Sequence, residues 1–489
     1  MSPAATGVMH TATPQEGPPD ECPPVRPWLR LPRRGSAMNA ANPQGQRAQG
    51  QRPTRSNAAR PAGGGRPGRT ARHAPEAAPA VPETVFVDRV GHRGDGIAET
   101  ASGPLYVPFA LPGEELVVER RGERGRIVEI VVPSSERVEP ACVHFGRCGG
   151  CALQHWQGDA YRAWKREQLV AALAGHGIEA PVEAVVASRP GERRRVSLTA
   201  ERIGGVMVVG FHERASHGLF DLQECPVADP AIVAALPALR RLAEPLAGRR
   251  DPLRLTVTAT RAGLDVAATD ARPLDERARD RLVSQVLSLG FARFSLEGEV
   301  LVAPQPPTID VDGVAVVPSP GGFLQASARA EAAMAALVVE GVGDARRVLD
   351  LFAGIGTFAL RLARTASVHA VDGDAPAVAA LGDARRFATD RRPITAEVRD
   401  LFRRPFQGKE FARYDAVVLD PPFAGARVQS EALALVAVPR VVMVSCNPAT
   451  LARDLAVLVS GGYRVEKVVP VDQFLWSPHI EAVAFLRRG

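Results

Sequence analysis

The chain has 489 residues, more than a single hydrophobic core usually serves, so we expect about two to four domains. No apolar run is long enough to span a bilayer and the N-terminus carries no secretory signal, so we predict a cytoplasmic protein without membrane contact. The net charge is +6, but residues 1–82 alone hold 11 arginines against 4 acidic residues. The rest of the chain is therefore close to neutral, and any surface for nucleic acid on it must be a local patch.

Residues 1–82 form a tail that is rich in Arg, Pro and Gly. Proline and glycine occupy 24 of its 82 positions, and Trp28 is its only aromatic residue. Such a segment cannot bury enough apolar surface to offset the entropy of the chain. We predict that the tail is disordered, and that Cys22 within it is incidental.

Residues 83–141 contain short apolar runs separated by glycine turns, a spacing that predicts a small β-barrel. The phrases GDGIA at Gly94 to Ala98 and VPFALPGE at Val107 to Glu114 resemble the TRAM domain, an OB-like RNA-binding module. Without that resemblance, any other small barrel would fit the pattern.

Residues 142–318 have a mixed α+β texture, with a helical pattern from Asp159 to His176 and several alternating strands. Four cysteines occur here, at Cys142, Cys148, Cys151 and Cys225. In a reducing compartment they favour a metal site over disulfides, and four thiolates suit either zinc or an iron–sulfur cluster. The run Arg193 to Arg195 suggests phosphate contacts, although a solvated strand face explains it equally well.

Residues 319–489 alternate apolar strands with helices, which indicates a doubly wound, largely parallel sheet. The strand VLDLF runs into Gly354 and Gly356, and Asp372 follows 18 residues after Gly354. A glycine-rich turn followed by an acidic residue is typical of a nucleotide-binding site, and dinucleotide-binding enzymes have the same two features. The full string LDLFAGIGTF, with VDGD and LDPP, resembles class I S-adenosylmethionine methyltransferases. The fold class expected is therefore α/β, with a class I Rossmann-like domain.

Cys446 and Glu481 are the candidate catalytic residues. Cys446 follows the apolar strand VVMVS, at the carboxyl end where doubly wound folds place their sites; a buried, inert cysteine is the alternative. Glu481 lies in the apolar string HIEAVAFL, where the alternative is a strand residue facing water. The strings SCNPATLARD and HIEAV resemble the nucleophile and general-base motifs of the RNA uracil-5-methyltransferase family.

The resemblance to that family extends from about Val85 to the C-terminus. It implies that Cys446 adds to carbon-6 of a uracil ring, that carbon-5 then takes the methyl group, and that Glu481 removes the carbon-5 proton. Carbon-5 is a poor nucleophile by itself, so this chemistry needs the thiolate. The resemblance also implies a set of S-adenosylmethionine-binding residues: Gln325, Phe352, Gly354, Gly356, Thr357, Asp372, Asp400 and Asp420.

Two positions depart from the family pattern. Phe423 stands where an arginine usually follows the Asp-Pro-Pro string, and Thr357 stands where asparagine is common. Arg427 is close enough in sequence to replace the missing arginine.

The cysteine spacing resembles the 23S rRNA (uracil-5-)-methyltransferase branch of the family, which implies a [4Fe–4S] cluster at the four cysteines and 23S ribosomal RNA as the partner of a monomeric enzyme. Three other functions fit parts of the sequence. They are a tRNA uridine-5 methyltransferase, an amino-group methyltransferase that uses Asp420-Pro-Pro-Phe423, and a non-catalytic RNA chaperone with an oxygen-sensing cluster.

Overall fold

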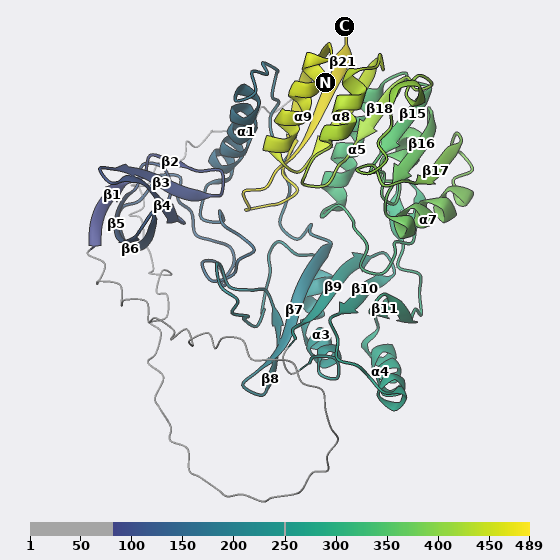
Figure 1. Ribbon diagram of the computed structural model, residues 1–489. Helices are drawn as coiled ribbons and strands as arrows, with labels where there is room; N and C mark the ends of the chain where they lie inside the picture. Colours follow the sequence, from purple (N-terminus) through teal and green to yellow (C-terminus); the bar gives the residue numbers. More distant parts are fainter. Residues whose placement is uncertain (1–81, 249–250) are drawn as a thin grey trace, which may run out of the picture. The chain divides into compact units, whose positions relative to one another are not determined.

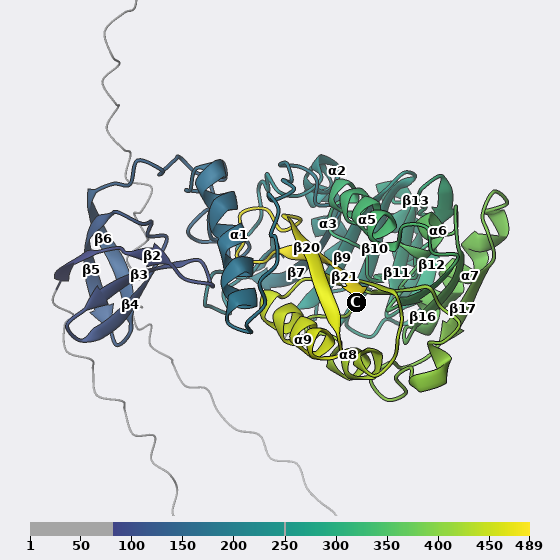
Figure 2. The same cartoon turned by 90° about the horizontal axis from the view of Figure 1, so that it is seen from above.

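The computed structural model describes residues 82–248 and 251–489, so the predicted tail lies outside the described residues except for Pro82, and Cys22 lies outside them as well. Figure 1 shows the chain coloured along its sequence, and Figure 2 gives a second view. Within these two ranges, no helix is both long enough and apolar enough to cross a membrane.

The first sheet is a small barrel. Its strands pair in the order β1-β5-β6-β4-β3-β2, and the stretch 82–90 supplies both ends of that order. The start of this stretch pairs with β5 and its end pairs with β3, where the Asp88 N–H donates to the Ile97 carbonyl at 2.9 Å. One strand thus joins both edges and closes the sheet, which leaves no open edge. The strands are β1 (Pro82–Phe86), β2 (Arg89–Val90), β3 (Asp95–Thr100), β4 (Gly103–Pro108), β5 (Glu115–Arg121) and β6 (Arg124–Val132).

The second sheet is mainly antiparallel, with strand order β12-β11-β10-β9-β7-β8. Only β10 and β11 run parallel, and α4 connects them. Leucines of α3 and α4 pack on one face of this sheet and close its core. The elements are β7 (Arg195–Ile203), β8 (Val206–Gly210), α2 (Pro230–Ala234), α3 (Leu236–Ala243), β9 (Leu253–Thr260), β10 (Gly263–Thr269), α4 (Glu276–Leu289), β11 (Arg293–Leu296) and β12 (Glu299–Val302), followed by the hairpin of β13 (Ile309–Val311) and β14 (Val314–Val316).

The third large sheet carries the C-terminal part of the chain, drawn in green to yellow in Figure 1. Its order is β17-β16-β15-β18-β19-β21-β20, parallel from β17 to β19, with β21 inserted antiparallel between β19 and β20. The elements are α5 (Ala328–Val342), β15 (Arg347–Leu351), α6 (Ala359–Leu362), β16 (Ser367–Asp372), α7 (Ala375–Ala384), β17 (Ile394–Val398), β18 (Ala416–Leu419), α8 (Arg427–Ala434), β19 (Arg440–Ser445), α9 (Pro448–Ser460), β20 (Tyr463–Val471) and β21 (Glu481–Arg488).

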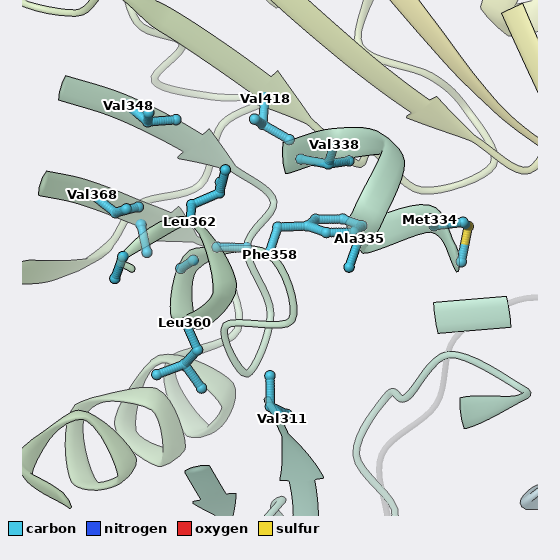
Figure 3. Packing of buried hydrophobic residues seen from close by; sticks show 14 of the residues in the cluster. Val311, Met334, Ala335, Val338, Val348, Phe358, Leu360, Leu362, Val368 and Val418 are labelled. Carbon is cyan, nitrogen blue, oxygen red and sulfur yellow. The ribbon is translucent and has the colours of Figure 1, made fainter. Parts of the chain in front are cut away.

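Alternation along the strands divides the apolar side chains between two faces of this sheet. Val418 joins the core formed with α5, α6 and α7, whereas its neighbour Val417 joins the core formed with α8 and α9. Figure 3 shows part of the first core, where Val338 of α5 and Phe358 lie close to Val348 and Val418 of the strands. Helices cover both faces, as the doubly wound prediction required.

Helix α1 (Gly158–Ala174) precedes the second sheet in sequence but packs on the third. Its Leu169 and Leu173 belong to the same core as Leu455 of α9, and both Figure 1 and Figure 2 show α1 alongside α9. The segment after it pairs with β20 through parallel bridges at Val182 and Val186, which covers the outer edge of that strand. A part of the chain predicted as central therefore supports the C-terminal sheet.

Candidate functional site

Strand order brings the candidate residues to one edge of the third sheet. Phe352 and Gly354 follow β15, Asp372 ends β16, Asp420 follows β18, and Cys446 follows β19. These strands are parallel, so their carboxyl ends meet at the same edge. Because β21 runs antiparallel, its first residue, Glu481, lies at that edge too.

These residues line a cavity of about 450 Å³. Every residue that the sequence predicted for catalysis or for the methyl donor lines it except Gly356. Gly356 lies behind the cavity wall at φ +90°, where an added Cβ would overlap Leu381 of α7. The predicted residues on the wall are Gln325, Phe352, Gly354, Thr357, Asp372, Asp400, Asp420, Cys446 and Glu481.

The turn after β15 is held in shape by Asp372. One carboxylate oxygen accepts the Gly354 backbone N–H and the other accepts the Asp374 N–H, both at 2.8 Å. Each oxygen keeps a second lone pair, so the carboxylate can still accept hydrogen bonds from ribose hydroxyls. Phe352 adopts φ +64°, an uncommon conformation for an aromatic residue, and its ring lies 5.6 Å from that of Phe402. The turn therefore presents backbone and an aromatic face to the cavity.

Asp420 follows β18 and lines the same cavity. Burial, followed by the charge of Glu481, raises the pKa of its carboxyl well above the ordinary value. Its Oδ2 accepts a hydrogen bond from the Gln325 carboxamide at 3.1 Å.

Cys446 is half-buried immediately before helix α9. Asn447 caps this helix by accepting the Ala449 N–H, and its own Nδ2 donates to the Phe423 carbonyl at 3.2 Å. Desolvation, followed by the charges of Glu481 and Asp420, raises the pKa of the Cys446 thiol to about 11. In the free protein at neutral pH, this group is therefore a thiol.

Glu481 is 4% exposed, so the alternative of a strand residue facing water is wrong. Desolvation raises the pKa of its carboxyl to about 7, and the hydrogen bond from Gln473 opposes that rise. Gln473 was not among the predicted residues. Its position as a polar residue shortly after the apolar end of β20 could have indicated it from the sequence. A carboxyl group that titrates near neutrality can accept a proton under physiological conditions.

Exposed aromatic rings stand at the same cavity. Phe323 is 68% exposed and Phe423 is 61% exposed, and both line it together with Phe402. Arg427, predicted as a replacement for the family's arginine, does not line the cavity; it begins α8 and pairs with Glu431 at 2.9 Å. The surface at position 423 is thus apolar and suited to stacking rather than to phosphate binding.

The four predicted cysteine ligands line a second cavity, of about 360 Å³. Burial raises the pKa of Cys142 to about 11 and that of Cys151 to about 12. Across residues 82–248 and 251–489, however, no three His, Cys, Asp or Glu side chains stand in an arrangement that could hold a metal ion. Four thiols lining one cavity are nevertheless the donor set that zinc or an iron–sulfur cluster takes.

Arg194, in the middle of the run 193–195, is buried, so neither phosphate contact nor a solvated strand face holds at this position. Arg194 is buried and pairs with Glu331 of α5 at 2.5 Å. Arg195 donates to the Gly321 carbonyl at 2.9 Å, and Arg193 lines the cysteine cavity. Two of these side chains thus join the second sheet to segments of the third.

Known proteins resemble the chain over most of its length. Residues 317–489 match the family described as tRNA (uracil-5-)-methyltransferase. An uncharacterized RNA methyltransferase of Brucella suis is 49% identical over 405 residues, which cover 83% of this chain and 98% of the relative. The 23S rRNA (uracil(1939)-C(5))-methyltransferase RlmD of Chromohalobacter salexigens is 33% identical over 431 residues, which cover 84% of this chain and 90% of that enzyme.

A solved structure has the same fold. The Pyrococcus abyssi tRNA (uracil-54, C5)-methyltransferase, in complex with S-adenosyl-L-homocysteine, matches with a TM-score of 0.66 and 24% identity over 82% of this chain and 99% of that one. The predicted α/β fold class is confirmed by this likeness.

Proposed function

Since this chain belongs to the family of S-adenosylmethionine-dependent RNA (uracil-5-)-methyltransferases, we propose that it methylates carbon-5 of a uridine in 23S ribosomal RNA, with Cys446 as nucleophile and Glu481 as general base. The observation that carries the proposal is the shared cavity, in which a cysteine and a buried glutamate face the residues proposed for the methyl donor. Membership of this family sets aside the non-catalytic RNA chaperone and the amino-group methyltransferase.

The proposed reaction begins at Cys446. Its thiol proton passes to solvent, and the resulting thiolate sulfur forms a bond to carbon-6. The electron pair of the carbon-5–carbon-6 double bond then shifts to give an enolate. Carbon-5 then takes the methyl group, and S-adenosylhomocysteine leaves. Glu481 removes the proton from carbon-5, and the electron pair restores the ring double bond as the carbon–sulfur bond breaks. One cysteine and one carboxylate are sufficient for this sequence.

The remaining residues bind and orient. We assign the ribose hydroxyls of the methyl donor to Asp372 and its adenine to the aromatic side of the cavity near Phe352 and Phe402. The target base must be unstacked to reach Cys446, and the exposed ring of Phe423 offers a surface for a neighbouring base.

The choice of 23S rRNA rests on the 33% identity to the Chromohalobacter salexigens enzyme, which spans 90% of that protein. Transfer RNA is the second candidate, because the matched family and the Pyrococcus abyssi enzyme both carry tRNA in their names. We propose that the barrel of residues 82–132 is a TRAM domain and that it holds the RNA that flanks the target base, since small OB-like barrels bind single-stranded nucleic acid. Cytoplasmic location and a monomeric state remain predictions that go with this substrate.

We further propose that Cys142, Cys148, Cys151 and Cys225 bind a [4Fe–4S] cluster. Their side chains line one cavity, and four thiolates are the ligand set that such a cluster takes. When bound, the cluster would stabilise the loop that carries three of these cysteines. No step of methyl transfer requires an electron, so the proposal gives it a structural role.

The direct test is mass-spectrometric mapping of 5-methyluridine in ribosomal and transfer RNA from a strain that lacks the gene. We expect one or more 23S rRNA positions to lose the methyl group, to regain it with the intact gene, and to remain unmodified with Cys446→Ala. If 5-methyluridine were lost only from tRNA, the substrate would be tRNA and not 23S rRNA. Restoration by Cys446→Ala would overturn the mechanism.

A further inference from the structure

Gln473 is a buried glutamine between β20 and β21 whose carboxamide donates both of its N–H groups and accepts one hydrogen bond on its oxygen. Its Nε2 donates to Glu481 Oε1 at 2.7 Å and to Gln325 Oε1 at 2.8 Å, and its Oε1 accepts the Ala326 backbone N–H at 3.0 Å. Only 5% of the residue is exposed, so water does not compete for these bonds.

The Ala326 contact determines which way the carboxamide points. A backbone N–H can only donate, so the amide oxygen must face Ala326 and the NH₂ group must face Glu481. Gln473 therefore offers Glu481 a donor and no acceptor. A donor favours the carboxylate over the carboxylic acid, and the carboxylate is the form that can accept a proton.

The same carboxamide connects the two halves of the cavity. Gln325 receives a hydrogen bond from Gln473 and donates one to Asp420 at 3.1 Å. A continuous chain of hydrogen bonds thus runs from Glu481 through Gln473 and Gln325 to Asp420.

Helix α1 fixes the backbone next to Gln473. Lys165 is fully buried and donates to Asp472 Oδ1 at 2.5 Å, to the His479 carbonyl at 2.6 Å and to the Phe474 carbonyl at 3.1 Å. The Asp472 N–H in turn donates to the Val186 carbonyl at 2.9 Å. Lys165 thus contacts both ends of the segment that joins Gln473 to Glu481. These contacts fix the backbone and restrict the orientation of the Gln473 carboxamide.

From this geometry, and resting on the proposed function of Glu481, we propose that Gln473 is a positioning residue for the methyl transfer reaction: it orients the Glu481 carboxylate and keeps it in its proton-accepting form. Its partners are the base and Gln325, so its effect falls on proton removal rather than on the formation of the bond between Cys446 and the ring.

Other titratable groups face Glu481 as well. Cys446 after β19 and Asp420 after β18 both feel its charge, and Asp420 in turn feels the charges of Asp350 and Asp372. Within residues 82–248 and 251–489, Gln473 donates a hydrogen bond to Glu481 and none of these four groups does. Loss of the Gln473 donor should therefore raise the pKa of Glu481 further above 7, its value with the donor in place.

The test compares Gln473→Met with wild type on two RNA substrates. On ordinary RNA we expect kcat to fall roughly 10- to 100-fold, the RNA KM to stay within about threefold, and a covalent protein–RNA adduct to accumulate. On RNA with 5-fluorouridine at the target, fluorine cannot leave as a proton, so trapping needs no base and its rate should stay within about threefold of wild type. The pH at which kcat reaches half its maximum should increase by about one unit, because loss of one hydrogen bond to a carboxylate raises its pKa by about that amount.

Gln429→Met is the matched control. Gln429 is another buried glutamine, and its carboxamide bonds only to the backbone of Phe406, away from the cavity. It should lose thermal stability like Gln473→Met but retain the pH profile and kcat. If Gln473→Met does not fold, Gln473→Asn, which keeps the amide but is too short for both partners, should show the same pH shift.

Any one of three results for Gln473→Met would overturn the inference. They are an unchanged kcat, an unchanged pH dependence of kcat, and a rate of trapping by 5-fluorouridine RNA that decreases as much as kcat does. Failure of the proposed function is distinct, because wild type itself would then form no adduct with 5-fluorouridine RNA.

Discussion

In its proposed role as general base, Glu481 has to meet two requirements that usually conflict: it must be buried to meet the ring and ionised to accept a proton. Desolvation holds the pKa of its carboxyl at about 7, so the fraction of active carboxylate rises as pH increases through neutrality. We expect kcat to increase tenfold per unit below about pH 7 and to level off above it. A stopped-flow or quenched-flow pH series would measure this.

The corresponding variant is Glu481→Gln, which removes the proton acceptor and keeps the size of the side chain. Turnover should fall by at least about 100-fold while a covalent adduct with ordinary RNA accumulates on denaturing gels. Glu340→Gln, at an exposed glutamate of α5 paired with Lys467, is the control and should retain activity. Turnover by Glu481→Gln without adduct would contradict the assigned role.

Cys446 should be unreactive before RNA binds. Desolvation and two nearby carboxylates raise the pKa of its thiol to about 11, so little thiolate exists at pH 8. We expect slow alkylation by iodoacetamide at pH 8, measured on the Cys446 peptide by mass spectrometry, and a steep increase as pH rises toward 11.

Glu481→Gln removes one of the charges that raise this pKa, so alkylation of Cys446 should become faster in that variant. Rapid alkylation of wild type at pH 8, equal to that of a free thiol, would show that the thiol is not held in its protonated form.

The turn between β15 and α6 contains two glycines, Gly354 and Gly356, whose surroundings leave different amounts of space for a side chain. An alanine at Gly356 would overlap Leu381 of α7 and would have to adopt φ +90°, whereas at Gly354 nothing lies within 4 Å of an added Cβ and φ is +53°. Gly356 therefore serves the packing of the turn on α7, and Gly354 serves the open side of the cavity.

This difference predicts a larger loss of stability for the alanine variant at Gly356 and weaker binding of the methyl donor for the variant at Gly354. Gly356→Ala should lower the free energy of unfolding by about 2–4 kcal/mol. Gly354→Ala should cost only about 1 kcal/mol of stability but weaken S-adenosylmethionine binding, because the new methyl group faces the cavity. Chemical denaturation and calorimetric titration measure the two effects, and equal losses of stability would contradict the assignment.

Residues 82–248 and 251–489 contain three large sheets, and the four cysteines line a cavity together with residues of β7 and of the loop before β21. After anaerobic purification we expect about four iron and four sulfide per chain, as a [4Fe–4S] cluster requires. Cys142→Ala and Cys225→Ala should each abolish that content. Cys22→Ala is the control and should keep it, and about one zinc per chain in place of iron would contradict the cluster.

Local pattern and motif chemistry were sufficient to predict several features. The alternation of strands and helices from residue 319 onward indicated the doubly wound sheet, because period and length are properties of contiguous residues. The predicted α1 region, Asp159 to His176, differs from the observed helix Gly158–Ala174 by only a few residues. Cys446 and Glu481 were identified by short strings around them, and both line the same cavity.

Contacts between segments far apart in the chain depended on packing and could not be predicted from such strings. Arginine runs suggest a solvated surface, yet Arg194 is buried because Glu331, 137 residues away, supplies a matching charge. In the same way, α1 covers the C-terminal sheet, and Lys165 meets Asp472 across 307 residues. Gln473 acquires its connection to Glu481 only when β21 inserts between β19 and β20. Short motifs were therefore sufficient to identify the proposed catalytic residues, whereas the hydrogen bonds to Glu481 form only when distant segments of the chain pack together.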